Sequence, residues 1–198
     1  MYPSCLKNLI DCLKCLPGIG EKSAERLAFS IMNFDKEKIT VFSNALLEVR
    51  DNIKRCKICD NITDKEYCSI CSDERRRKDI VFVVEKPKDV VLFEKINVYN
   101  GVYHVLNGLI SPLDGVNPED INIKKLIDRI KKGNIKEVIL ALKPSIEGET
   151  TMQYIKKILE PLDVKITKIA TGIPIGTDIE YIDAMTLEMS LEERKEYT

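Results

Sequence analysis

Apolar residues recur every three or four positions along the first quarter of the chain, and this spacing predicts three amphipathic helices. The helices are expected over residues 4–16, 23–32 and 35–55. The inner face of the third helix is expected to consist of Ile39, Phe42, Ala45, Leu46, Val49 and Ile53. Residues 1–55 are therefore predicted to form a small helical module in which that face packs inward.

The pattern changes after residue 79, where short apolar runs alternate with helical stretches. Strands are expected over 80–84, 137–142 and 164–170, and helices over 87–95, 121–132, 149–160 and 184–196. A β-branched apolar run such as Ile80–Val84 is typical of a buried parallel strand, and alternating strands and helices indicate a sheet covered on both faces. We predict an α+β chain, with a mostly parallel α/β domain over 80–171 and a helical arm over 172–198.

Four cysteines lie between these two regions, as two Cys-x-x-Cys pairs. The pairs are Cys56 with Cys59 and Cys68 with Cys71, and eight residues separate them. This is ligand spacing for one tetrahedral zinc ion, and four thiolates leave no open coordination position for catalysis. We therefore predict a structural zinc that folds the segment 56–79, which is too short to build a core. A pair of disulfides is the alternative.

The remaining three cysteines lie near the N-terminus. Cys12 and Cys15 form a further Cys-x-x-Cys, with Cys5 close by, but no second pair follows at a matching distance. They also interleave with the apolar face of the first predicted helix. We expect core or partly buried cysteines here rather than metal ligands.

A glycine-containing turn follows the first helix. Gly18, Ile19 and Gly20 lie in the pattern Gly-apolar-Gly-x-x-x-Ala-x-x-apolar of a helix-hairpin-helix, with Ile19 expected to pack inward. The glycines let backbone N–H groups approach a phosphate, and the positive end of the next helix dipole begins there. Lys22 and Arg26 are four residues apart, so they share one helix face that can contact a phosphate backbone. The alternative is an ordinary helical connection with solvated charges.

Overall charge restricts where nucleic acid could bind. The 198 residues carry a formal net charge of −1, so a DNA surface must be a local patch rather than a global property. We find no apolar run of membrane-spanning length and no secretory leader, and seven cysteines without a leader fit a reducing compartment. A cytoplasmic location is expected.

A basic run, Arg75-Arg76-Arg77-Lys78, follows the last of the four cysteines. A zinc ion with four thiolates has a formal charge of −2, so these side chains are candidates for counter-charges. Direct contact with DNA is the other interpretation, and the two are compatible.

The order strand, Glu85, helix and later strand, loop, Gly148-Glu149, helix resembles the Toprim domain of topoisomerases, primases and related nucleases. That resemblance implies a carboxylate cluster that holds Mg²⁺ against a phosphate. The position expected to carry Asp-x-Asp has Lys143-Pro144-Ser145 instead, so both aspartates are missing. We therefore predict that this site does not catalyse phosphoryl transfer.

The three parts in this order resemble the RecR family of bacterial recombination-repair proteins, over essentially residues 2–197. The motifs that carry the resemblance are Glu85-Lys86-Pro87-Lys88-Asp89, the run from Tyr103 to Gly115 that contains Leu109-Ile110-Ser111-Pro112-Leu113-Asp114-Gly115, and Gly172-Ile173-Pro174-Ile175-Gly176. His104 lies in this run and is expected to be a satisfied structural histidine. The resemblance implies boundaries at 1–55, 56–79, 80–171 and 172–198.

Resemblance to this family further implies a non-enzymatic, nucleoid-associated DNA clamp that forms a tetrameric ring. With RecO and RecF, it would help RecA displace single-strand-binding protein at gaps. Gly18, Gly20, Lys22 and Arg26 would face DNA, and the four cysteines would hold zinc. An acidic Toprim remnant would offer a surface to RecO, made of Glu85, Asp89, Glu147 and Glu149.

Two other functions stay open at this stage. A Toprim nuclease or primase would use Glu85 together with Glu147 and Glu149, and would require Mg²⁺. A zinc adaptor that binds only proteins would use the hairpin as core and would not bind DNA.

Overall fold

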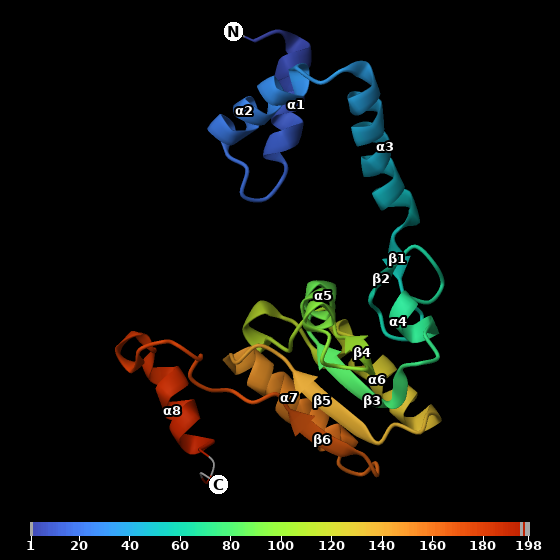
Figure 1. Ribbon diagram of the computed structural model, residues 1–198, viewed down its shortest axis with the longest axis vertical. Coiled ribbons are helices and arrows are strands. Elements are labelled where there is room, and N and C mark those ends of the chain that lie inside the picture. The colour runs from blue at the N-terminus through green and yellow to red at the C-terminus, as the bar shows by residue number, and fades with distance from the viewer. Residues whose placement is uncertain (1, 195, 197–198) are drawn as a thin grey trace. The chain divides into compact units, whose positions relative to one another are not determined.

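The computed structural model describes the chain except for Met1, Lys195, Tyr197 and Thr198. It divides into two compact units, an N-terminal unit of residues 1–53 and a C-terminal unit of residues 54–198 (Figure 1). Each unit is described by itself below.

The N-terminal unit contains the three predicted helices: α1 (Ser4–Lys14), α2 (Glu21–Met32) and α3 (Lys36–Asn52). The core between α1 and α2 consists of Leu6, Ile10, Ala24 and Ala28. Ile19 of the turn is partly buried against this core, as predicted. The alanines of α2 are small, so the two helices approach closely. This close packing fixes the conformation of the turn that connects them.

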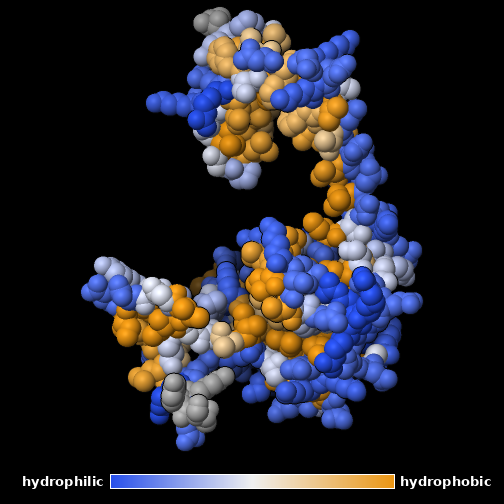
Figure 2. Space-filling view, viewed as in Figure 1, coloured by the Kyte–Doolittle hydropathy of each residue, from blue (hydrophilic) through white to orange (hydrophobic). Residues whose placement is uncertain are grey.

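The prediction that one face of α3 is buried is wrong for a single chain. None of the residues of α3 is buried, and Phe42, Leu46 and Val49 are 46%, 61% and 63% exposed. Figure 2 shows apolar side chains at the surface over this helix. A periodic apolar pattern identifies a face that gains free energy on burial, but it does not say which surface covers it.

The C-terminal unit begins with the zinc-finger segment. Strands β1 (Lys54–Arg55) and β2 (Ile62–Thr63) pair antiparallel, with Lys54 opposite Thr63, and the short helix α4 (Ser69–Ser72) follows. Cys56 and Cys59 lie between β1 and β2, whereas Cys68 is the N-cap of α4 and Cys71 lies within it.

A four-stranded parallel sheet forms the centre of this unit, with the order β4-β3-β5-β6. Its strands are β3 (Arg77–Val84), β4 (Gly101–Val105), β5 (Glu137–Ala141) and β6 (Lys165–Lys168). The mostly parallel sheet is confirmed, whereas the apolar pattern did not predict β4. A Cβ on Gly101 would lie 2.9 Å from the carbonyl oxygen of Ile80, so a glycine lets β4 start beside β3.

Helices cover both faces of the sheet, as predicted. They are α5 (Pro87–Ile96), α6 (Ile123–Lys132) and α7 (Ile146–Leu159). Phe82 of β3 packs on Phe93 of α5, with ring centroids 4.6 Å apart, while Val81 and Val83 point to the other face and are fully buried. Leu126 of α6 and Leu159 of α7 belong to the same core.

The remaining elements are three 3₁₀ turns and one helix. The turns are Pro112–Asp114, Pro118–Asp120 and Ile179–Tyr181, and the helix is α8 (Ala184–Glu192). The helix was expected to reach residue 196, and position 195 of that range lies outside the described residues. Ile175, Tyr181 and Leu191 of this arm are strongly exposed, and Figure 2 shows apolar side chains over α8. Over the described residues, no helix has the length and apolar character needed to cross a bilayer.

Candidate metal centre and nucleic-acid interface

The four predicted zinc ligands converge in space. The Sγ atoms of Cys56, Cys59, Cys68 and Cys71 all lie within 4.8 Å of one another, and all four residues are buried. Sulfur atoms about 2.3 Å from a central zinc lie about 3.8 Å apart in a tetrahedron, which matches this spacing. In the described part of the chain, this is the one group of three or more Cys, His, Asp or Glu side chains that could hold a metal ion.

The four cysteines are free thiols rather than two disulfides. The Sγ atoms of Cys59 and Cys68 are 3.5 Å apart, far longer than an S–S bond of about 2.05 Å. Hydrogen bonds from the thiols of Cys59 and Cys71 hold the pKa of Cys68 well below its usual range. Cys68 thus favours the thiolate, which is the form that binds zinc, whereas the hydrogen bond with Cys68 raises the pKa of Cys59.

The zinc finger is attached to the sheet by backbone and side-chain contacts. The N–H of Val105, on the edge strand β4, donates to the carbonyl oxygen of Cys59 at 2.8 Å. Covering an edge strand in this way removes unpaired backbone groups from solvent. The finger therefore packs against the α/β domain within one compact unit.

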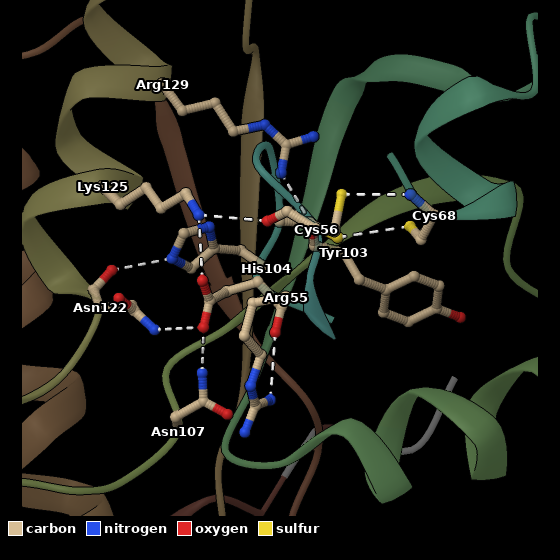
Figure 3. A network of polar contacts seen from close by, with 11 residues as sticks. Arg55, Cys56, Cys68, Tyr103, His104, Asn107, Asn122, Lys125 and Arg129 are labelled. Atoms are coloured by element: carbon tan, nitrogen blue, oxygen red, sulfur yellow. Dashed lines mark hydrogen bonds and ion pairs between the residues drawn. The ribbon is translucent and has the colours of Figure 1, made fainter. Parts of the chain in front are cut away.

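Asp60, directly after the first cysteine pair, is the centre of this attachment. Its Oδ2 accepts hydrogen bonds from the side-chain amides of Asn107 and Asn122, and its Oδ1 pairs with Nζ of Lys125 at 3.0 Å. Its backbone is in the left-handed region at φ 64°, which Asp tolerates better than most residues. Figure 3 shows Asn107, Asn122 and Lys125 converging from different segments of the domain.

Helix α6 supplies two cations to this region (Figure 3). Lys125 also donates to the carbonyl oxygen of Cys56 at 3.2 Å, and Nη1 of Arg129 donates to the carbonyl oxygen of Tyr103 at 2.7 Å. His104 was expected to be fully satisfied. Its Nε2 bonds the carbonyl oxygen of Asn122 at 2.8 Å, but its buried Nδ1 has no partner among the described residues.

The predicted DNA-contact hairpin is exposed. Gly18 has φ +81°, which favours glycine, and a Cβ on either Gly18 or Gly20 would meet no atom within 4 Å. Gly20 is the N-cap of α2, and no side chain in the described structure caps that end. Since the first N–H groups of a helix have no intrahelical partner, they are open to an anion here.

Lys22 and Arg26 are both exposed on α2. Glu21 lies beside them, but Nζ of Lys14 pairs with its Oε2 at 2.5 Å, and this hydrogen bond raises the pKa of Lys14. Lys14 therefore offsets the carboxylate in the first turn of α2, which would otherwise oppose a phosphate there.

The prediction that the three N-terminal cysteines lie in the core or are partly buried is wrong. Cys5, Cys12 and Cys15 are all exposed on or next to α1. The buried stripe of α1 is narrow because it packs only on α2, so residues at its flank stay in solvent.

The basic run after the last zinc-finger cysteine is mostly paired within the protein. Nη2 of Arg75 bonds Asp73 at 2.9 Å, Nη2 of Arg77 bonds Asp79 at 3.0 Å, and Arg76 forms a bidentate pair with Glu94. Arg76 is 17% exposed at its side chain, and Glu94 also accepts from Oη of Tyr103 at 2.8 Å. These arginines are held by nearby carboxylates, and Lys78 has no such partner within 4.0 Å among the described residues.

The four carboxylates of the Toprim remnant are each held locally rather than aimed at one point. Glu85 pairs with Lys86 at 3.0 Å, and Asp89 caps the N–H of Lys86 at 2.8 Å. Glu147 accepts from the hydroxyl of Ser145 at 2.7 Å, and this bond lowers the pKa of Glu147.

The fourth carboxylate, Glu149, lies 3.9 Å from Nζ of Lys168. Lys168 also pairs with Glu193 directly after α8, and Glu193 accepts from the hydroxyl of Thr171 at 2.7 Å. Lys168, the last residue of β6, thus brings a positive charge next to Glu149. A Cβ on Gly148 would be 2.0 Å from the carbonyl oxygen of Lys143, so the altered loop folds tightly over this glycine.

Comparison with known proteins covers the chain nearly end to end. Successive segments match the families described as RecR helix-hairpin-helix (residues 6–50), RecR four-cysteine zinc finger domain (53–73), Toprim domain (79–170) and RecR C-terminal (172–195). The Recombination protein RecR of Clostridium perfringens (strain ATCC 13124) is 51% identical over 193 residues, which is 98% of this chain and 97% of that protein. The protein of the same name from Chloroherpeton thalassium (strain ATCC 35110) is 52% identical over 197 residues, 96% of each.

This chain belongs to the RecR family. The family and the sulfur geometry agree on a structural zinc ion as its cofactor, held by a four-cysteine finger. The Toprim match over 79–170 contains the acidic remnant, and the hairpin match over 6–50 contains Lys22 and Arg26.

Several residues with clear roles in this RecR family member were not predicted. Asp60 and Lys125 attach the finger to the sheet, and Lys168 lies 3.9 Å from Glu149, one of the four carboxylates of the Toprim remnant. A signal for the attachment exists in the sequence, since Asn107 and Asn122 interrupt apolar stretches in which a polar residue needs partners. No local pattern connects them to Asp60, because the three are brought together only by the fold.

Proposed function

We propose that this chain is a non-catalytic DNA-binding clamp of recombinational repair, which acts in the cytoplasm with RecO and RecF to help load RecA at single-strand gaps. The observation that carries the proposal is the exposed, uncapped start of α2 at Gly20, with Lys22 and Arg26 beside it. Backbone amides and point charges contact phosphates without reading bases, so binding is independent of sequence.

Within this proposal, Cys56, Cys59, Cys68 and Cys71 are the zinc ligands, and Gly18, Gly20, Lys22 and Arg26 contact DNA. The functional segments are 1–55, 56–79, 80–171 and 172–198. The acidic remnant, Glu85, Asp89, Glu147 and Glu149, is the surface for RecO. Its carboxylates are half-buried on one edge of the domain, where a basic partner can reach them.

Assembly into a ring of several copies, tetrameric in this proposal, is supported by the apolar faces that a single chain leaves in solvent. Helix α3 buries none of its residues, and its exposed side chains include Phe42, Leu46 and Val49, which share one face at 46%, 61% and 63% exposure. A soluble monomer rarely leaves such a continuous apolar face uncovered. A second copy of the same module is the occupant that this face fits, since its own apolar stripe has the same length.

The absence of catalysis is supported by the scattered carboxylates. Two or three must converge on one Mg²⁺ for phosphoryl transfer, and in the described chain Glu85, Glu147 and Glu149 instead lie against Lys86, Ser145 and Lys168 respectively. Incubation of the protein with DNA and Mg²⁺ is expected to leave the DNA intact. Cleavage that Glu85→Gln abolishes would instead make this a Toprim nuclease.

The hairpin assignment is tested by replacing both Lys22 and Arg26 with Ala. Each lost phosphate contact lowers the slope of log affinity against log salt by about 0.9, so the slope falls by about 2 for duplex DNA. The matched control replaces Lys7 and Arg50, which are exposed cations of the same unit, with Ala, and leaves the slope near that of the wild type. Equal slopes for wild type and both variants would remove the hairpin from the DNA interface.

A further inference from the structure

Apart from Lys124, which is exposed in the first turn, the basic side chains of α6 fall into two sets. Lys125 and Arg129 point toward the zinc finger and β4, where both are used in hydrogen bonds (Figure 3). Lys131 and Lys132, in the last turn, are exposed, and no carboxylate of the described residues lies within 4.0 Å of either. Their role is therefore not explained by the attachment of the finger.

The end of α6 lies at the edge of the sheet where the parallel strands begin. The N–H of Lys136, just before β5, donates to the carbonyl oxygen of Asp79 at 2.7 Å, and the N–H of Lys165 donates to the carbonyl oxygen of Lys136 at 2.9 Å. These bonds place three strand starts side by side. The lysines of this edge are called the basic rim: Lys78, Lys131, Lys132, Lys136 and Lys165.

The rim surrounds the loop Gly133–Ile135, which separates two hollows. One has a volume of about 500 Å³ and is bordered by Lys78 and Arg129, and the other has about 420 Å³ and is bordered by Lys131 and Lys136. Both hollows include residues of the loop itself. A polymer bound across the loop in an extended conformation would thus contact lysine side chains at both hollows.

The carboxylates at the rim do not cancel its charge. Asp79 is paired with Arg77 at 3.0 Å, and Glu137 lies 3.8 Å from Lys165 and accepts from the hydroxyl of Thr167. Asp163 is exposed beside the second hollow, and Asp128 is exposed on α6, three and four residues before Lys131 and Lys132. Lys78, Lys131, Lys132 and Lys136 have no ion-pair partner within the described structure, so the rim keeps a positive excess.

The hairpin alone is a weak source of positive charge. Residues 1–53 contain seven Lys or Arg and seven Asp or Glu, so the N-terminal unit is formally neutral. Affinity for DNA depends mainly on how many phosphates are neutralised. A clamp with a neutral hairpin module therefore requires further cations elsewhere on the chain.

We propose that the basic rim is a second contact surface for the phosphate backbone of DNA, separate from the hairpin. The proposal rests on the proposed DNA-clamp function and adds a binding site in the α/β domain. Lysines without rigid partners contact phosphates as point charges, which suits binding without sequence preference. The acidic remnant lies at the opposite edge of the sheet, where the strands end. DNA is thus proposed to bind the basic edge, and RecO the acidic edge.

The test compares two double variants that remove the same charge from opposite edges of the sheet. Lys132→Gln with Lys136→Gln changes the rim, and Lys88→Gln with Lys143→Gln changes exposed lysines at the carboxyl edge. DNA affinity is measured by fluorescence anisotropy on a duplex across a salt series. The rim variant is expected to lower the slope of log affinity against log salt by about 1 to 2, and the control to leave it unchanged.

Three outcomes contradict the proposal in distinguishable ways. Equal slopes for the rim variant and the control, with a reduced slope for the Lys22 and Arg26 variant, overturn the rim but leave the clamp. Equal reductions in both lysine variants show that only net charge matters and also overturn the rim. No DNA binding by the wild type would overturn the proposed function itself. Unchanged thermal unfolding of all variants shows that any difference comes from binding.

Discussion

The two units of this RecR family member bury their apolar residues to very different extents. Between α1 and α2 the core consists of Leu6, Ile10, Ala24 and Ala28, whereas the core of the C-terminal unit contains twenty-seven buried residues. A domain of fewer than about 60 residues buries too little surface to be more than marginally stable alone. The C-terminal unit thus has a core of its own, whereas the N-terminal unit has only a small one, and under the proposed assembly other copies would cover its apolar surface.

The largest expected effect in the C-terminal unit follows from loss of zinc. Cys59→Ser removes one of four ligands, and structural zinc contributes on the order of 10 kcal/mol to folding. We expect zinc content to fall to near zero and amide hydrogen exchange to rise across 54–73 and at Val105, which bonds Cys59. Exchange in α1 and α2 is expected to stay unchanged.

Cys5→Ser is the matched control, because Cys5 is exposed and lies in the other unit. It is expected to keep full zinc content by elemental mass spectrometry. Loss of structure in α1 and α2 upon loss of zinc would contradict the independence of the two units.

The second effect compares two leucines. Leu126 is fully buried in α6, so Leu126→Ala is expected to lower the free energy of unfolding by about 2–5 kcal/mol. Leu46 is 61% exposed on α3, so Leu46→Ala is expected to change the free energy of unfolding of a dilute monomer by less than about 0.5 kcal/mol. Urea unfolding at low protein concentration measures both.

Leu46→Ala has a second expected result, at higher concentration. Because α3 is proposed to be covered by another copy, the variant should shift sedimentation profiles toward smaller species at micromolar protein. An unchanged profile would remove α3 from the contact between copies.

The attachment of the zinc finger gives a smaller effect. Asp60→Asn leaves Lys125 without its carboxylate in a mostly buried network, and we expect a loss of about 2–3 kcal/mol of unfolding free energy. Asp64 also lies in the zinc-finger segment, directly after β2, but is exposed, so Asp64→Asn is the control and should change the free energy of unfolding by less than about 0.5 kcal/mol. A similar small change for both would mean that the network does not hold the finger in place.

The smallest effect depends on pH. Burial, together with the charges of Arg129 and Lys125, lowers the pKa of His104 to about 4, while the unfolded chain keeps a value of about 6.5. The unfolded state therefore takes up a proton first as pH falls, and this destabilises the folded state. Between pH 7 and 5.5 the expected loss is about 1 kcal/mol.

Comparison with His104→Gln isolates this contribution, since the variant has no titrating group at the site. Its unfolding free energy should depend less on pH over the same range, with bound zinc monitored in parallel. Identical pH profiles would show that His104 is not the titrating group.

The sequence predicted the parts of the fold that local patterns specify. The spacing of Cys56, Cys59, Cys68 and Cys71 was enough to predict a zinc site, because two short turns determine where the sulfur atoms point. The strand Ile80–Val84 and the glycine turn before α2 were equally local. The edge strand β4 was missed, because Gly101–Val105 contains Tyr103 and His104, whose burial depends on α6 and on the finger.

The failures share one physical cause, which is that burial is a property of contacts between distant segments. The apolar face of α3 was expected to be inside, but nothing in a helical pattern states what covers it. Asp60 looked like an ordinary loop residue, although the fold surrounds it with Asn107, Asn122 and Lys125. The exposure of Cys12 and Cys15 was likewise decided by the narrow contact between α1 and α2.

The central claim is that the chain binds the phosphate backbone without cutting it. The most direct test is fluorescence anisotropy of the wild type with unrelated DNA sequences, across a salt series with Mg²⁺ present, followed by electrophoresis of the recovered DNA. The account predicts equal affinities for the different sequences, a steep loss of affinity with salt and intact DNA. Cleaved DNA, or no binding at low salt, would contradict it.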